Sequence, residues 1–295
     1  MNKMHRIGTP KEAKRCVIAL HCSLASGRQW ARLGEELGGN TRLIAPDISG
    51  YGNSRTSILL PTTLAGEIAM LGEQLREAEG PFHLIGHSYG GAIAFKLATQ
   101  SSFARYVRSL TLIEPVLPTL LAGSGADHRL YRRFDEFARG IQADLWKGLA
   151  MEAIDKFMSF WNGSATPEKL SPEARLRLIE HADKLAFDLA AAFAEKDVAT
   201  TAAGIGVPTL LFSGGLSPYL TQRIAERLAS LIPGVDARHL PAAGHMMPFS
   251  HGKVINPEIA GHIARADDLA GVRLASPLEE AAAAEWTREL GRAQK

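Results

Sequence analysis

The stretch "FHLIGHSYGGAIAFKLA", residues 82–98, has the pattern of a buried strand, a serine between glycines and then a helix. Its centre, residues 86–90, has the spacing Gly-x-Ser-x-Gly. A serine at a sharp strand-to-helix turn takes a strained backbone conformation, and the flanking glycines let neighbouring backbone approach closely. The turn exposes the hydroxyl at the sheet edge, where the helix N-terminus directs partial positive charge toward it. We therefore predict that Ser88 is a nucleophile rather than an incidental serine in a glycine-rich turn.

Short apolar runs recur along the chain, with helical patterns between them. Runs that are apolar on both faces are typical of strands buried in a parallel sheet. Alternating strands and helices predict an α/β fold, with a mostly parallel central sheet and helices on both faces. The predicted strands are 16–21, 42–46, 82–87, 107–114, 207–214 and 235–240, and the predicted helices are 27–38, 62–79, 89–101 and 219–232.

The alternation stops between residues 116 and 200, where the pattern is helical and no strand is predicted. We interpret 116–200 as a helical cap inserted into a core made of residues 1–115 and 201–270. An amphipathic helix is predicted at 271–295, with packing or a homodimer contact as its two candidate roles.

Composition argues against several classes of partner. The chain has 295 residues and 33 basic against 31 acidic side chains, with no basic block, so nucleic acid is not expected. No apolar run approaches the roughly 20 residues of a membrane span, and the polar N-terminus lacks a signal-peptide core. Cys16 and Cys22 lie too far apart along one strand for a disulfide and suit a reducing compartment. We expect a cytoplasmic protein that acts on a small molecule.

A serine hydroxyl needs a base, and His245 in "PAAGHMMP" is the best placed of the ten histidines. It follows the last predicted strand, so it should share the carboxyl edge of the sheet with Ser88. His251 is a rival in the same loop but lies farther from the strand. His87, beside the serine, is expected to project away from the site.

The first strong strand runs into a turn of small residues, "VIALHCSLASGRQW", residues 17–30. Acyl transfer needs two N–H donors for the oxyanion, and we expect them from the backbone of Ser23 and of Tyr89. A metal site at Cys16, His21 and Cys22 lacks the usual ligand spacing, so no metal is expected.

Six motifs resemble the α/β-hydrolase superfamily, in the order of that family. They are "LHCSLASGRQW", "LIAPDISGYGNSR", "LIGHSYGG", "LTLIEP", "VPTLLFSGG" and "PAAGHMMP", and they cover most of 16–250. The resemblance implies nucleophile Ser88, base His245, a helical cap, and neither metal nor organic cofactor. It also implies that the first antiparallel strands of the fold are missing or reduced to about residues 4–8.

The usual acid of the family sits just after the penultimate strand, where this chain has Ser217, which supplies no charge. Glu114 in "LTLIEP" ends the strand that follows the nucleophile's strand, so it should lie close to Ser88. A glutamate on an apolar strand is costly unless paired, which favours a functional role. We predict Glu114 as the acid, with Asp47 as the alternative.

These features favour a serine hydrolase that cleaves a small carboxylic ester through an acyl-enzyme. The alternatives are C–C bond hydrolysis of a ketonic substrate on the same site, or a non-catalytic ligand-binding protein. Epoxide hydrolases and dehalogenases of this fold need a carboxylate nucleophile, so Ser88 excludes them by resemblance. The candidate substrate contacts are His21, Trp146, Phe157, Phe160 and Trp161.

Overall fold

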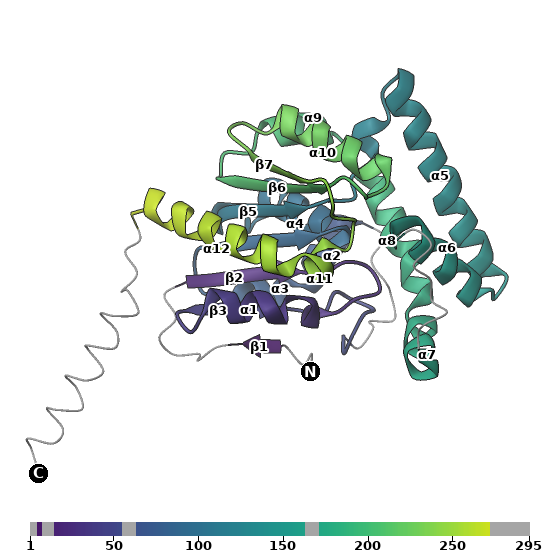
Figure 1. Cartoon of the computed structure of the whole chain (residues 1–295), viewed down its shortest axis with the longest axis horizontal. Coiled ribbons are helices and arrows are strands. Elements are labelled where there is room, and N and C mark those ends of the chain that lie inside the picture. Colours follow the sequence, from purple (N-terminus) through teal and green to yellow (C-terminus); the bar gives the residue numbers. More distant parts are fainter. Residues whose placement is uncertain (1–4, 8–14, 55–62, 163–170, 272–295) are drawn as a thin grey trace, which may run out of the picture.

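A seven-stranded sheet forms the centre of the computed structural model, which describes residues 5–7, 15–54, 63–162 and 171–271. The strand order is β1-β3-β2-β4-β5-β6-β7; β1 is antiparallel to β3 and every other pair is parallel (Figure 1). The predicted α/β fold with a mostly parallel sheet is therefore confirmed. The strands are β1 (His5–Ile7), β2 (Arg15–Leu20), β3 (Thr41–Ala45), β4 (Phe82–His87), β5 (Val107–Ile113), β6 (Thr209–Gly214) and β7 (Asp236–Leu240).

Helices cover both faces of the sheet because alternate strand residues point to opposite sides. Val17 and Ala19 of β2 pack with one set of helices, whereas Ile18 and Leu20 pack with the other. The first set is η1 (Gly27–Trp30), α1 (Ala31–Leu37), α11 (Met247–Ser250) and α12 (Gly252–Leu269); the second is α2 (Leu64–Met70), α3 (Gly72–Arg76), α4 (Tyr89–Gln100), α9 (Val198–Ala203) and α10 (Tyr219–Leu231). The short η2 (Ala104–Tyr106) leads into β5.

The predicted helix at 62–79 is two helices in the structure. Thr63 caps α2 by accepting a hydrogen bond from the N–H of Gly66 at 3.1 Å. The helical path is interrupted at Leu71, whose ψ is −2°, before α3 begins at Gly72. Glycine has a low helix propensity, which favours a break in the helix at Gly72. The pattern of apolar residues alone does not reveal this break.

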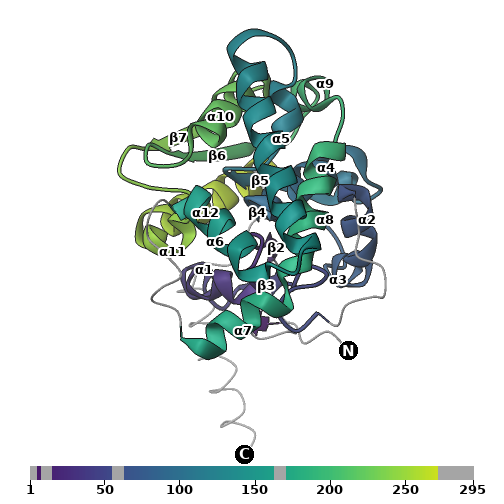
Figure 2. The same cartoon turned by 90° about the vertical axis from the view of Figure 1, so that its right-hand side faces the viewer.

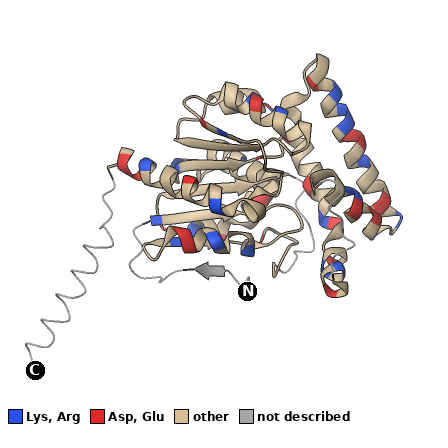
Figure 3. Ribbon diagram, viewed as in Figure 1, with Lys and Arg blue, Asp and Glu red and all other residues tan. Residues whose placement is uncertain are grey.

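The described residues of the predicted cap, 116–162 and 171–200, are mainly helical and lie at one end of the sheet, on the right in Figure 1. The longest of them, α5, carries Arg among Asp and Glu along its length (Figure 3), and its ion pair Arg132–Glu136 is mostly exposed, in keeping with a solvated face. We call α5 to α8 the cap. Its helices are α5 (Gly125–Trp146), α6 (Ala150–Asn162), α7 (Pro172–Glu180) and α8 (Ala182–Ala194), preceded by η3 (Pro118–Leu121).

A buried carboxylate fastens α12 to the sheet. Asp267 is 2% exposed and accepts hydrogen bonds from Arg15 at 2.7 Å, Arg108 at 2.9 Å and His83 at 3.1 Å. These partners lie on β2, β5 and β4, so α12 is tied across the centre of the sheet. No described helix is both long and apolar enough to span a bilayer. The predicted helix at 271–295 lies outside the described residues, apart from Gly271.

Candidate active site

The turn between β4 and α4 is sharp because of its glycines. A Cβ on Gly86 would lie 2.3 Å from the carbonyl oxygen of Gly90, and a Cβ on Gly90 would lie 2.4 Å from that of His21. Only glycine permits these approaches. Ser88, between them, has φ 57° and ψ −118°, a backbone conformation that residues other than glycine rarely adopt. The turn therefore places Ser88 immediately before α4, at the carboxyl edge of the sheet.

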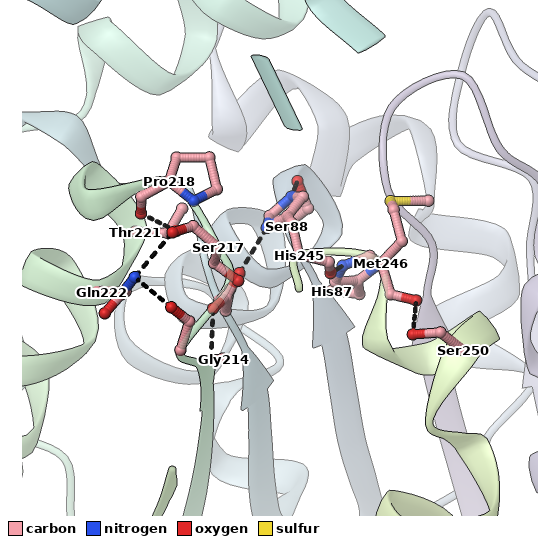
Figure 4. A network of polar contacts seen from close by, with 12 residues as sticks. His87, Ser88, Gly214, Ser217, Pro218, Thr221, Gln222, His245, Met246 and Ser250 are labelled. Atoms are coloured by element: carbon pink, nitrogen blue, oxygen red, sulfur yellow. Dashed lines mark hydrogen bonds and ion pairs between the residues drawn. The ribbon is translucent and has the colours of Figure 1, made fainter. Parts of the chain in front are cut away.

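Ser88, His245 and Glu114 come together in one chain of hydrogen bonds. Ser88 Oγ lies 2.9 Å from His245 Nε2, and Glu114 Oε2 lies 2.7 Å from His245 Nδ1 (Figure 4 shows Ser88 beside His245). Because a carboxylate only accepts, Nδ1 carries the proton and Nε2 accepts from the serine hydroxyl. The rival His251 instead pairs with Ser250 Oγ at 2.8 Å and does not join this chain.

Glu114 is fully buried at the end of β5, with φ 43°. Asp47, the alternative acid, is not brought to His245. Its two carboxylate oxygens accept from the backbone N–H groups of Gly27 and Asn53, each at 2.8 Å. Asp47 thus organises the loop after β3, and the carboxylate that faces the histidine is that of Glu114.

Ser217 occupies the turn after β6, where the family usually carries its acid. Its hydroxyl is buried and has no hydrogen-bond partner among the described groups. It lies 2.9 Å from the position that a Cβ on Gly214 would take. The N–H of Gly214 donates to Glu114 Oε1 at 2.7 Å. The turn therefore contacts Glu114 through its backbone, whereas the Ser217 side chain makes no described hydrogen bond to it.

The two expected oxyanion donors lie on the turns after β2 and β4. Ser23 lines the same cavity as Ser88, and the next residue, Leu24, has φ 59°, which bends the chain sharply. Within the described part of the chain, the N–H groups of Ser23 and Tyr89 make no hydrogen bond. Tyr89 is the first residue of α4, where N–H groups have no helical partner. Both donors are thus free for a ligand oxygen.

His87 does not project away from the site, contrary to the prediction. Its Nε2–H donates to the carbonyl oxygen of His245 at 2.8 Å, and its Nδ1 accepts from the Gln29 amide at 3.1 Å. Gln29 Oε1 in turn accepts from the N–H of Cys22 at 3.2 Å. Burial, and then the neighbouring His245, lower the pKa of His87 well below its usual range, so it stays neutral. Sequence reasoning missed Gln29, because nothing in the residues around it distinguishes it from a solvent-exposed polar residue of a turn.

His21 does not reach the cavity, so its prediction as a substrate contact is wrong. The ring is fully buried; its Nδ1 donates to the carbonyl oxygen of Cys22 at 2.7 Å, and its Nε2 accepts from the N–H of Ile48 at 2.9 Å. Burial lowers the pKa of His21 to about 4, although its bond to Cys22 opposes this. A neutral ring with both nitrogens occupied joins the turn after β2 to the loop after β3.

The cap aromatics divide into two groups. Trp161 stacks on the ring of His245, with centroids 4.3 Å apart, and Phe157 also lines the cavity. Phe160 instead stacks on Phe137 inside the cap, and Trp146 is 92% exposed. Neither lines the cavity, because each lies on a helix face turned away from the sheet edge. The helical pattern identified aromatic residues but not the face that each one occupies.

A cavity of about 720 Å³ opens over Ser88 and His245, between the sheet edge and the cap. This volume suits a small organic ligand. The charged side chains of its described lining are Arg28 and Arg177. The half-buried His181 also lines the cavity, and no described lining residue is acidic.

Comparison with known proteins gives a consistent result. The model described as "Alpha/beta hydrolase family" matches residues 17–258. "Lipase LipV" of Mycobacterium tuberculosis is 32% identical over 102 residues, 34% of this chain and 37% of that protein. The alignments to two curated relatives cover 37% and 62% of their lengths, so this chain spans less than two thirds of either.

Solved structures share the fold at low identity. MenH from S. aureus has a TM-score of 0.72 at 18% identity, covering 90% of this chain and all of that one. The esterase EaEST from Exiguobacterium antarcticum has a TM-score of 0.68 at 19% identity, covering 88% of this chain and 94% of that one. At these identities the likeness shows the fold alone.

Proposed function

The chain belongs to the alpha/beta hydrolase family, and on this basis we propose that it is a serine hydrolase that cleaves a small carboxylic ester through an acyl-enzyme. The observation that carries the proposal is the hydrogen-bonded chain from Ser88 through His245 to Glu114 beside the cavity. The similarity to a lipase over part of its length supports an ester as the bond cleaved.

In the acylation step, Ser88 Oγ attacks the ester carbonyl carbon. His245 Nε2, 2.9 Å away, takes the hydroxyl proton as the bond forms. The positive charge that develops on the imidazole faces the buried carboxylate of Glu114, which also holds the ring in the required tautomer. Collapse of the tetrahedral intermediate expels the alcohol, which receives the proton from Nε2.

The oxyanion of that intermediate would accept hydrogen bonds from the N–H groups of Ser23 and Tyr89. Tyr89 begins α4, so the helix N-terminus adds partial positive charge at the same point. Water then gives a proton to His245 and attacks the acyl carbonyl carbon. The bond from that carbon to Ser88 Oγ breaks, Nε2 returns the proton to Oγ, and the carboxylic acid leaves.

The test is a library of p-nitrophenyl esters of increasing acyl length, read by release of p-nitrophenol. We expect turnover with a preferred chain length, and loss of turnover in Ser88→Ala. The matched control is Ser217→Ala, which removes a second buried hydroxyl at the same sheet edge and should keep the parent rate. Equal loss in both variants, or full activity in Ser88→Ala, contradicts the proposal.

The same protein preparation can distinguish the proposed ester hydrolase from two alternatives, a C–C hydrolase and a non-catalytic binding protein. A C–C hydrolase would turn over a vinylogous diketone faster than any ester of the library. A non-catalytic binding protein would leave Ser88 unlabelled by a fluorophosphonate, whereas a serine hydrolase becomes covalently modified there.

A further inference from the structure

A buried cluster of charges lies behind the two oxyanion residues, outside the cavity. Lys184 of α8 donates to Glu67 of α2 at 2.5 Å and to Asp188 of α8. Exposed fractions are 1% for Lys184, none for Glu67 and 3% for Asp188. The helices that carry them lie side by side with α4 (Figure 2). Burying three charged groups is costly even when they are paired, so the cluster is a candidate for a role besides stability.

Each carboxylate of this cluster also binds the side chain of one oxyanion residue. The Tyr89 hydroxyl donates to Glu67 at 2.9 Å, and the Ser23 hydroxyl donates to Asp188 at 2.5 Å. Tyr89 follows β4 and Ser23 follows β2, and Lys184 binds both carboxylates. One ammonium group therefore links the side chains of both residues whose N–H groups would bind the oxyanion.

The protonated states of Lys184 and Tyr89 suit a permanent anchor, although burial raises the pKa of Glu67. Burial disfavours the charged form of Lys184, but attraction to Asp188 and Glu67 outweighs it and raises the pKa of the ammonium. Burial, then the nearby carboxylates, raise the pKa of the Tyr89 phenol well above its usual range. The lysine thus stays charged and the phenol stays a donor across the neutral pH range.

Oxyanion stabilisation depends on donors held within fractions of an ångström of the developing charge. Resting on the proposed hydrolase function, we propose that Lys184 and Asp188 of the cap are positioning residues that set the separation of the Ser23 and Tyr89 N–H groups. The cap then does more than shape the acyl pocket, since its docking onto the core completes the oxyanion hole.

The chain supplies a matched control on the same cap helix, α8, where it packs against α4. Lys96 of α4 donates to Glu195 at the C-terminal end of α8 at 2.9 Å, with Glu195 5% exposed. This ion pair also joins cap and core, but it touches neither oxyanion residue. Loss of it should loosen the same interface without moving the two N–H groups.

The experiment compares Asp188→Asn, Ser23→Ala and Glu195→Gln in kcat, KM, unfolding temperature and the ratio of ester to thionoester turnover. Sulfur is larger than oxygen and accepts weaker hydrogen bonds, so this ratio reports the fit of the oxyanion hole. We expect kcat to fall about 10- to 100-fold in the first two variants, less than on complete loss of a donor, with KM within about threefold and a smaller ratio. Glu195→Gln should lower only the unfolding temperature.

A normal kcat and ratio in Ser23→Ala, or the same losses in Glu195→Gln, would overturn the inference. Ser23→Ala removes one hydroxyl from a part-buried residue, so it keeps the test decisive if Asp188→Asn does not fold. Fluorophosphonate labelling of Ser88 separates the two proposals. A parent protein that is neither labelled nor active refutes the hydrolase function and this inference with it, whereas an active parent with unaffected variants refutes this inference alone.

Discussion

Replacing Glu114 by glutamine keeps the size of the side chain and exchanges one acceptor for a donor. The two carboxylate oxygens accept from His245 Nδ1–H and from Gly214 N–H, both at 2.7 Å. Glutamine has a single acceptor, so one of these N–H groups must face an amide NH2. If the NH2 faces His245, it donates to Nδ1 and moves the ring proton to Nε2, which can then no longer accept from Ser88.

We expect kcat on an activated ester to fall about 10³- to 10⁴-fold, as when a triad carboxylate becomes an amide. At 1.36 kcal/mol per tenfold change, this is about 4–5.5 kcal/mol of transition-state stabilisation. If the NH2 instead faces Gly214, two buried donors oppose each other, and the free energy of unfolding falls by about 1–3 kcal/mol. Steady-state kinetics and urea unfolding on one preparation measure both effects.

Asp47→Asn is the matched control, because it makes the same chemical change in a buried carboxylate whose partners among the described residues are backbone N–H groups. It should lower the unfolding temperature and keep kcat within about tenfold of the parent, as for a structural site away from the chemistry. A folded Glu114→Gln protein with near-parent turnover, together with an impaired Asp47→Asn, would refute the reasoning.

Three further outcomes can be measured. Asp267→Asn should lower the free energy of unfolding by about 3 kcal/mol at pH 7. Burial opposes ionisation of Asp267, but hydrogen bonds from its imidazole and guanidinium partners outweigh it and lower the pKa of Asp267. The stabilisation is therefore present above the unfolded pKa of about 4 and is lost as the pH falls below it. In urea unfolding, the difference in free energy of unfolding between parent and variant should be smaller at about pH 3 than at pH 7, and an unchanged difference would contradict this. Arg177→Gln should raise KM about tenfold for esters with a carboxylate on the acyl group and leave neutral isosteres unchanged, whereas an equal rise for both would exclude charge recognition. Ser217→Asp in the Glu114→Gln background should recover at least about tenfold in kcat, since a carboxylate in that turn can orient the histidine; no recovery would show that the turn cannot reach it.

The sheet and the edge that carries the candidate active site were predictable because their signals are local. The predicted strand at 82–87 matches β4 residue for residue, and the others agree with the structure within about two residues. Glu114 could be singled out because a charge at the end of an apolar strand, next to the nucleophile's strand, is costly to bury without a partner. The chain order of parallel strands then brought it to the edge that holds Ser88.

The supporting contacts could not be predicted because they join residues far apart in sequence. Ser23 and Asp188 are separated by 165 positions, and His87 and Gln29 by 58. Apolar periodicity predicts that a helix has a buried face, but it does not say which partner covers that face. Trp146 shows the consequence, since it lies on a cap helix and yet remains almost fully exposed.

Ser88 and Glu114 end neighbouring strands, and both have positive φ although neither is glycine. Each such residue is less stable by about 1–3 kcal/mol than a relaxed one. Mutation of either residue to glycine would therefore relieve backbone strain while removing a side chain that the proposed reaction needs. Under the proposed function, selection for activity maintains both side chains, although glycine at either position would give a more stable and inactive protein. A lineage released from that selection should drift to glycine at one of these two positions, keeping the sheet and losing the hydrolase.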